Sequence, residues 1–219
     1  EDLSRGLGDV YKRQAELTGV HYHVSNVSTK ETVEVIKRAK LNGIKITCDT
    51  SPPYFSLNEL ELSTYDTSFK LSPPLRNEED RIAIQNAIFD DTIDVITSDH
   101  KPMSNDTKIL PFTSASTGAS GIETLLPLTL NLLNKSDVSI MNILKKITLN
   151  PSKLLKVEIP KIKSNEKANF IIFDLNEQYL INKDLLQTSP TPFHGRPVQG
   201  KNYMSMMNGE IVFDNLDLL

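Results

Sequence analysis

Asp99 and His100 are the residues of this 219-residue chain best suited to acid–base or metal chemistry. They follow residues 92–98, a largely β-branched run with the composition of a buried strand. A barrel strand ends at the mouth where ligands bind, so an aspartate there could hold a metal ion or carry a proton, while His100 could orient a neighbouring group or the loop. In the alternative interpretation, Asp99 caps the following turn and His100 is a surface residue.

Arg76 is a second candidate, and it follows two prolines and a leucine in residues 73–76. The prolines restrict the backbone that leads to it, and a guanidinium can bind a carboxylate through two parallel hydrogen bonds. This favours recognition of an anionic group. In the alternative interpretation, the segment is a rigid turn whose arginine pairs with a nearby carboxylate such as Asp80.

The other three histidines of the sequence are candidate metal ligands. His21 and His23 are two residues apart in a predicted strand, so both point to the same side, where two imidazoles could share a metal ion. A pair without a third ligand nearby is not a zinc site, and both could be ordinary strand histidines with hydrogen-bond partners. His194 lies in a turn-rich segment, and turn chemistry explains it.

The candidate residues lie in a pattern in which short apolar runs alternate with amphipathic helices. Residues 28–31 form a capping box, with Ser28 as N-cap, and predict a helix to about residue 41 that Asn42-Gly43 ends. Asn77 predicts the start of a second helix that buries Ile84, Ala87 and Ile88. Strands are predicted over residues 20–27, 44–48 and 93–98. This alternation is typical of βαβ units and a parallel sheet.

The second half of the sequence changes in texture. A long polar loop over residues 101–120 precedes helices predicted over 122–134 and 140–149, the latter ended by Asn150-Pro151. From about residue 161 the pattern shows strands without helices between them. These strands are predicted over residues 169–174 and 179–182 and as a hairpin over 198–213 that turns at Asn208-Gly209. They indicate a separate small β module.

The composition excludes several classes of function. The net charge is −4, and the lysines are scattered among acidic residues, so there is no basic stripe for nucleic acid. No apolar run approaches the roughly 20 residues that span a bilayer, so no membrane partner is expected. The single cysteine, Cys48, fits a reducing cytoplasm. Phosphate-binding glycine loops, C-x-x-C pairs and nucleophile elbows are absent from the sequence.

Residues 1–14 are predicted to be a non-native leader. They lack hydrophobic periodicity, and residues 9–14 look like translated adapter sequence, so no helix or strand of the fold is predicted from them. We therefore expect that the natural protein begins further upstream and that this chain is its C-terminal part.

Five blocks of the sequence, in order and with matching spacing, resemble class I dihydroorotases of the amidohydrolase superfamily. The blocks are residues 22–31, 47–55, 70–76, 92–100 and 121–127. The resemblance covers about residues 20–214 and implies an α/β fold, the C-terminal part of a (β/α)8 TIM-type barrel with one half of a small β-sandwich. The expected domains are residues 15–158 for the barrel and 159–219 for the β-sandwich segment.

The resemblance also implies chemistry. Members of the family use a binuclear zinc centre to interconvert dihydroorotate and N-carbamoyl-L-aspartate in de novo pyrimidine biosynthesis. Asp99 matches the aspartate that binds zinc and shuttles the proton, whereas the N-terminal ligands of the family are not in this chain. Asn26 stands at the position of a histidine ligand. Because an amide binds zinc less well than imidazole, a weak or absent second metal is expected.

The resemblance implies substrate contacts at Ser72, Arg76, Met103 and Gly118. Ser72 replaces an asparagine of the family, and Met103 replaces a histidine and cannot donate a hydrogen bond to the substrate.

Two hypotheses follow. The chain belongs to a dihydroorotase with an altered site, as Asp99 and Arg76 favour. Alternatively it is a noncatalytic dihydroorotase-like partner of aspartate transcarbamoylase, as Asn26, Ser72 and Met103 favour. Assembly as a homo-oligomer stays open in either case.

Overall fold

The computed structural model describes residues 13–135, 137–159, 161–182 and 190–215. They fall into two compact units, the first reaching to residue 122 and including residues 190–192, the second taking the remainder. Of the predicted leader, only residues 13 and 14 are described, and they are helical. The domain boundary expected between residues 158 and 159 stays a prediction.

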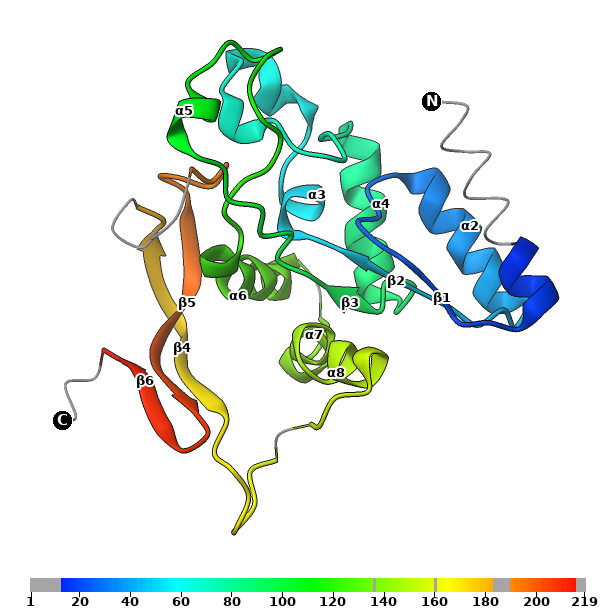
Figure 1. Ribbon diagram of the computed structural model, residues 1–219, viewed down its shortest axis with the longest axis vertical. Helices are drawn as coiled ribbons and strands as arrows, with labels where there is room; N and C mark the ends of the chain where they lie inside the picture. Colours follow the sequence, from blue (N-terminus) through cyan, green and yellow to red (C-terminus); the bar gives the residue numbers. More distant parts are fainter. Residues whose placement is uncertain (1–12, 136, 160, 183–189, 216–219) are drawn as a thin grey trace. The chain divides into compact units, whose positions relative to one another are not determined.

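The first unit is built on a three-stranded parallel sheet in the order β1-β2-β3, visible in Figure 1. The strands are β1 (Tyr22–Val24), β2 (Ile46–Thr50) and β3 (Val95–Ile96). The parallel arrangement confirms the prediction, but β2 begins two residues later than expected. The reason is local, because the chain is still folded back on the preceding helix, where the Ile44 amide donates to the carbonyl of Ala39 at 3.1 Å.

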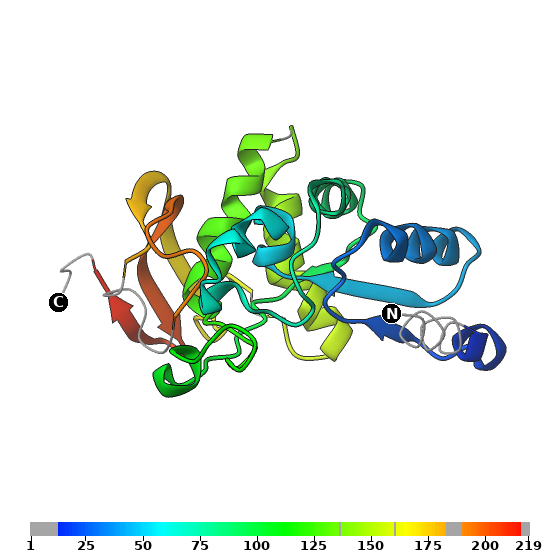
Figure 2. The ribbon, with the colours of Figure 1, turned by 90° about the horizontal axis from the view of Figure 1, so that it is seen from above.

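Two helices, α2 (Lys30–Leu41) and α4 (Glu78–Phe89), lie side by side on one face of this sheet (Figures 1 and 2). The predicted start of α4 is confirmed, since the Asn77 side chain accepts the Asp80 amide, and its predicted apolar side chains are buried. The predicted N-cap of α2 was wrong by one residue. Thr29, still extended with φ −124°, accepts the Thr32 amide in place of Ser28, which is buried.

The first turn of α4 also caps α2. Asp80 Oδ1 accepts the backbone amide of Lys30, the first residue of α2, at 2.7 Å, and the Asp80 carboxylate is buried. Next to it, the side chains of Lys30 and Glu79 form an ion pair. A carboxylate at the positive end of a helix satisfies an otherwise unpaired amide, so Asp80 couples the two helices.

We predict that Asp80→Ala lowers the free energy of unfolding by about 1 to 2 kcal/mol, the usual cost of a lost cap. Urea denaturation followed by circular dichroism measures this loss. Glu79→Ala is the matched control, because its ion pair with Lys30 is exposed to solvent and its removal should cost much less stability. Equal losses in the two variants would contradict the capping role.

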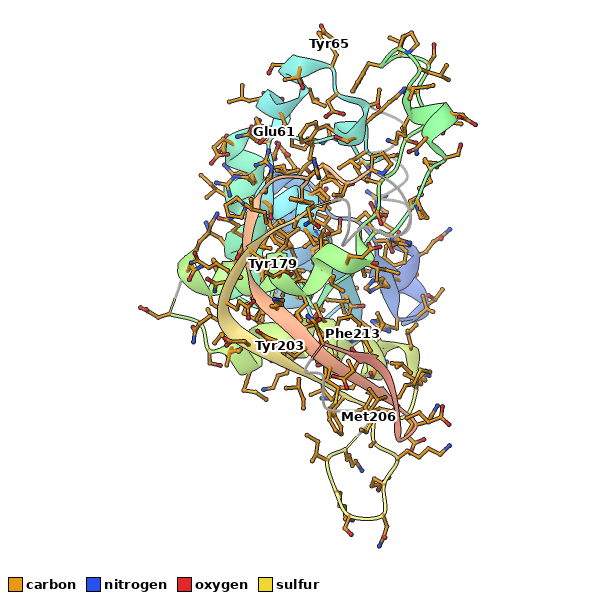
Figure 3. The ribbon with its side chains drawn as sticks, turned by 90° about the vertical axis from the view of Figure 1, so that its left-hand side faces the viewer. Glu61, Tyr65, Tyr179, Tyr203, Met206 and Phe213 are labelled. Atoms are coloured by element: carbon orange, nitrogen blue, oxygen red, sulfur yellow. The ribbon has the colours of Figure 1, made fainter. Side chains whose placement is uncertain are left out.

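The segments between β2 and α4 and after β3 contain short helices. They are α3 (Pro52–Ser56), η1 (Glu59–Thr64), η2 (Thr67–Phe69) and α5 (Asn105–Lys108). The predicted 101–120 loop is closed at its base, where the Lys101 amide donates to Ala119 at 3.0 Å. Tyr65, labelled in Figure 3, meets Phe112 of this loop edge to face with ring centroids 6.0 Å apart. The loop is therefore tied to the segment after η1.

The second unit begins with helices. They are α6 (Ile122–Leu130), η3 (Asn131–Lys135), α7 (Ile140–Ile147) and α8 (Leu149–Leu155). The helix predicted over residues 140–149 ends two residues earlier, at Ile147, and α8 starts at Leu149 with Pro151 in its first turn. A proline is tolerated there, since the first amides of a helix have no intrahelical partner. None of the described helices is long and apolar enough to cross a membrane.

An antiparallel sheet completes the second unit, in the order β4-β5-β6. Its strands are β4 (Phe170–Leu180), β5 (Pro197–Met207) and β6 (Glu210–Asp214), and Figure 3 shows Tyr179, Tyr203 and Phe213 along it. The predicted turn is confirmed, with positive φ at both Asn208 and Gly209. The two strands predicted before the hairpin are one strand, interrupted where Asp174 Oδ1 accepts the amides of Asn176 and Glu177.

Candidate functional site

Asn26 and Asp99 lie just beyond the carboxyl ends of β1 and β3, both with left-handed backbones. Their φ angles are 55° and 44°, a region that residues other than glycine rarely adopt and that Asn and Asp tolerate best. Asn26 Nδ2 lies 3.4 Å from Asp99 Oδ1 and donates to it. Two such residues in contact at the edge of a sheet make this place a candidate site, because strained backbone is often found at functional positions.

Asp49, on the central strand β2, connects the ends of the three strands. One of its oxygens, Oδ1, accepts the Asn26 amide at 2.8 Å and the Thr97 hydroxyl at 3.3 Å. The other, Oδ2, lies 2.9 Å from His23 Nε2. The Asp49 side chain is buried, so these donors replace the water that the carboxylate loses. Sequence reasoning missed Asp49, because it follows the strand predicted over residues 44–48 and its contacts depend on how β2 pairs with β1 and β3.

The two strand histidines point to the same side, as predicted. His21 Nε2 and His23 Nδ1 both contact the Thr47 hydroxyl, at 2.9 and 2.8 Å. Their hydrogen bonds are those of ordinary strand histidines, which is the second of the two interpretations that the sequence left open.

His100 fixes the chain that follows the 101–120 loop. Its Nδ1 accepts the backbone amides of Gly121 and Ile122, at 3.2 and 3.3 Å. Gly121 lies so close to the end of β3 that a Cβ atom on it would be 2.2 Å from the carbonyl oxygen of Ser98. The residue before Asp99 is thus packed directly against this glycine.

We predict that Gly121→Ala destabilises the fold by about 2 kcal/mol or more, because the new methyl group must push backbone away from backbone. Gly43→Ala is the control, since its φ of +73° strains an alanine but nothing lies within 4 Å, and about 1 kcal/mol is expected. Thermal unfolding of both variants measures the difference. A Gly121 variant as stable as the Gly43 variant would contradict the close packing.

The Asp99 carboxyl is partly buried, and that burial raises its pKa above the ordinary value. The Asn26 hydrogen bond and the charge of Lys101 act against the rise, while the charge of Asp49 adds to it. A raised pKa is the direction expected of a carboxyl that acts as a general acid–base group.

Tyr54 places Asp99 and Arg76 in one electrostatic environment. The buried Tyr54 hydroxyl donates to the Pro73 carbonyl at 2.9 Å. Burial strongly raises the pKa of the Tyr54 phenol, the charge of Asp99 raises it further, and the charge of Arg76 lowers it. Both charged residues therefore lie within electrostatic reach of this hydroxyl. Sequence reasoning missed Tyr54, since nothing local marks an aromatic residue after two prolines as part of a site.

Arg76 has not taken the structural role that the sequence left open. None of the ion pairs between described residues includes it, and its buried Nε has no hydrogen-bond partner among them. Asp80, its suggested partner, instead accepts the amide of Lys30. A buried guanidinium nitrogen without a partner is costly, and an incoming anion would satisfy it.

The other predicted substrate contacts are less closely tied to Asp99. Ser72 is exposed and Met103 is half-buried, and no hydrogen bond between described residues joins either side chain to Asp99. Gly118 is buried with φ +126°, donates its amide to the Lys70 carbonyl, and would clash with the Lys101 carbonyl if it carried a Cβ. Its observed role is close packing of the loop, and substrate contact at these three residues stays a prediction.

The residues do not by themselves fit a zinc ion. The Asp99 carboxylate is a suitable oxygen donor, but its neighbour Asn26 offers an amide, and the His23 ring is engaged by Thr47 and Asp49. Across the described ranges, no group of three or more His, Cys, Asp or Glu side chains could hold a metal ion. Asp99 thus supplies at most one donor to a metal held elsewhere.

The comparisons with known proteins agree with the fold. Residues 5–212 match the model of the Amidohydrolase family. The chain belongs to this family. Among its relatives, the dihydroorotase of Anaplasma phagocytophilum is 36% identical over 200 residues, covering 90% of this chain and 45% of the relative. The dihydroorotase of Acetivibrio thermocellus is 37% identical over 201 residues, covering 90% and 47%. The chain thus spans about half the length of these amidohydrolases.

Solved amidohydrolase structures show the same arrangement. The L-hydantoinase of Arthrobacter aurescens matches with a TM-score of 0.86 and 25% identity, over 95% of this chain and 48% of that one. An inactive dihydroorotase-like domain of a Chaetomium thermophilum multifunctional protein matches in fold, with a TM-score of 0.66 and 18% identity over 94% and 55%. The predicted resemblance to dihydroorotases and the predicted α/β class are both confirmed.

Proposed function

We propose that this chain supplies the proton-transfer and anion-binding side chains of a dihydroorotase site, which interconverts dihydroorotate and N-carbamoyl-L-aspartate. The observation that carries the proposal is Asp99, a partly buried carboxyl with a raised pKa in a left-handed backbone at the end of β3. The similarity to dihydroorotases supports the choice of substrate, and the mixed α/β fold supports the placement of the carboxyl at a sheet edge.

Asp99 would carry one proton through the reaction. As water attacks the carbonyl carbon of the cyclic amide, the carboxylate takes a proton from that water. When the carbon–nitrogen bond breaks, the same carboxyl gives the proton to the departing nitrogen, so that the ring opens to a carboxylic acid and a ureido group, and the new acid then loses its own proton to solvent. The Asn26 amide holds one Asp99 oxygen and leaves the other for this exchange. The raised pKa suits both halves of the transfer.

Arg76 would bind the carboxylate that dihydroorotate and N-carbamoyl-L-aspartate share. Its buried and unpartnered Nε and its position near Tyr54 support this role. The Tyr54 hydroxyl donates a hydrogen bond to the Pro73 carbonyl, so the turn that leads to Arg76 is held next to Tyr54.

We predict that Asp99→Asn in the complete gene product lowers kcat for dihydroorotate hydrolysis by about a hundredfold or more, since an amide cannot exchange the proton. The rate is measured in a spectrophotometer as the loss of ultraviolet absorbance when the cyclic amide of dihydroorotate is opened. Asp106→Asn, an exposed change on α5, is the control and should leave the rate unaltered. An Asp99 variant with ordinary turnover would exclude the proposed proton carrier.

Arg76→Gln is expected to raise KM for dihydroorotate by about tenfold or more while kcat changes far less, because binding of the unreactive carboxylate is lost. Steady-state kinetics of the variant give both constants. Arg38→Gln, on the exposed side of α2, is the matched control. An unchanged KM would show that Arg76 does not bind the substrate.

A second candidate function is a noncatalytic dihydroorotase-like protein that binds aspartate transcarbamoylase. Asn26 favours it, because an amide bonded to Asp99 replaces a zinc-binding imidazole at this position of the resemblance. Zinc content and dihydroorotate turnover of the complete gene product discriminate the two. About two zinc ions per chain with turnover support the enzyme. Absence of turnover, with co-elution alongside aspartate transcarbamoylase in gel filtration, supports the noncatalytic partner.

A further inference from the structure

The Asp49 side chain uses both of its oxygens inside the sheet. Only 5% of the residue is exposed, and it lies on β2, between the strands that lead to Asn26 and to Asp99. Oδ1 accepts from the Asn26 amide and from the Thr97 hydroxyl, whereas Oδ2 contacts His23. A buried carboxylate with donors on both oxygens has one favourable orientation.

His23 holds that orientation from the side of β1. Its Nε2 is 2.9 Å from Asp49 Oδ2, and its Nδ1 is 2.8 Å from the Thr47 hydroxyl. With a contact at each ring nitrogen, the imidazole cannot rotate without losing one of them. Rotation of the Asp49 carboxylate would likewise break the contact with His23, so Oδ1 stays directed at the Asn26 amide.

The backbone around Asn26 is fixed to β2 on both sides. The Asn26 amide donates to Asp49 Oδ1, and the next amide, that of Val27, donates to the Asp49 carbonyl at 2.9 Å. The Thr50 hydroxyl donates to the Val27 carbonyl at 2.8 Å. These contacts hold Asn26 at a φ of 55°, a conformation that an unrestrained asparagine would leave most of the time.

From that conformation, the Asn26 side chain reaches Asp99. Its Nδ2 is 3.4 Å from Asp99 Oδ1, and Asp99 itself has a left-handed backbone. A single contact of this length would be weak if either partner were mobile. It restricts Asp99 only because the Asp49 carboxylate fixes the position from which the amide is presented.

We propose that Asp49, held by His23, is a positioning residue that places the Asn26 amide on Asp99 and so keeps the Asp99 carboxylate in one orientation. The importance of that orientation for turnover rests on the proposed function. The placement of Asn26 does not rest on it and can be tested alone.

The test compares Asp49→Ala with Asp49→Asn in the complete gene product. Alanine removes the acceptor, whereas asparagine keeps an oxygen for the Asn26 amide at nearly the same position. Two readouts are used: the side-chain amide signals of Asn26 in a nitrogen-15 NMR spectrum, and kcat with KM for dihydroorotate. Asn26→Ala assigns the signals, and Glu34→Gln, on the exposed side of α2, is the control.

With Asp49→Ala, we expect the Asn26 side-chain signals to move to the positions of a free asparagine and kcat to fall about tenfold or more with KM nearly constant, because misplacing a reacting group mainly slows the chemical step. Asp49→Asn should restore the signals and most of kcat. A structural role alone would lower thermal stability without this rescue and without the separation of kcat from KM. Unmoved Asn26 signals in folded Asp49→Ala would overturn the proposal.

His23→Phe covers the case in which Asp49→Ala does not fold. Phenylalanine keeps a planar aromatic ring at this position and removes both polar contacts, so Asp49 gains freedom and the Asn26 signals should broaden or move. Signals identical to those of the native protein would overturn the proposal. If the native protein shows no dihydroorotate turnover, the proposed function fails, and the Asn26 signals of the variants still decide on the positioning role.

Discussion

The buried carboxylate of Asp49 is the constraint on which the site depends. Removing a carboxylate from water costs several kcal/mol unless donors replace the lost hydration, and here an amide, a hydroxyl and an imidazole do so. Those donors come from the segments of β1 and β3 on either side of β2. The Asp49 side chain therefore joins the ends of the three strands. Asn26 and Asp99, whose backbones are left-handed, lie just beyond two of those ends.

Local features of the fold could be predicted from the sequence because they depend on neighbours along the chain. Asn77 begins α4, and Asn208-Gly209 turns the hairpin, as cap and turn chemistry require. The same logic misplaced two strand boundaries, although the contacts that decide them are also short in sequence. The Ile44 amide donates to the Ala39 carbonyl just after α2, before β2 begins, and β4 is interrupted where Asp174 accepts the amides of Asn176 and Glu177.

The residues of the candidate site also fall into those that the sequence pattern indicates and those that it does not. Asp99 could be found because an acidic residue after an apolar run is visible in any strand pattern, and Arg76 because two prolines precede it. Asp49 and Tyr54 could not be assigned, because their roles depend on the register of β2 against its neighbours and on the loop that brings Pro73 to the phenol. Sequence alone also left the role of His100 open, which in the structure binds the backbone at Gly121.

The chain belongs to the amidohydrolase family, and the polar residues near Asp99 contact one another. Asn26, which the resemblance to dihydroorotases predicts at the position of a histidine ligand, donates to Asp99, and the His23 ring contacts Thr47 and Asp49. Within the described residues, the polar groups are thus satisfied by one another at Asp49 and unsatisfied at Arg76. The contacts of Asp49 thus fix the shape of one part of the candidate site. The Arg76 nitrogen, in the other part, is left to donate a hydrogen bond to an anion.

A crystal structure of the complete gene product with N-carbamoyl-L-aspartate tests most directly whether Asp99 and Arg76 form one substrate site. We expect the ureido nitrogen to lie within hydrogen-bond distance of Asp99 and a ligand carboxylate to contact Arg76. A ligand bound away from Asp99, or Arg76 paired with a protein carboxylate while the ligand is present, would contradict this expectation.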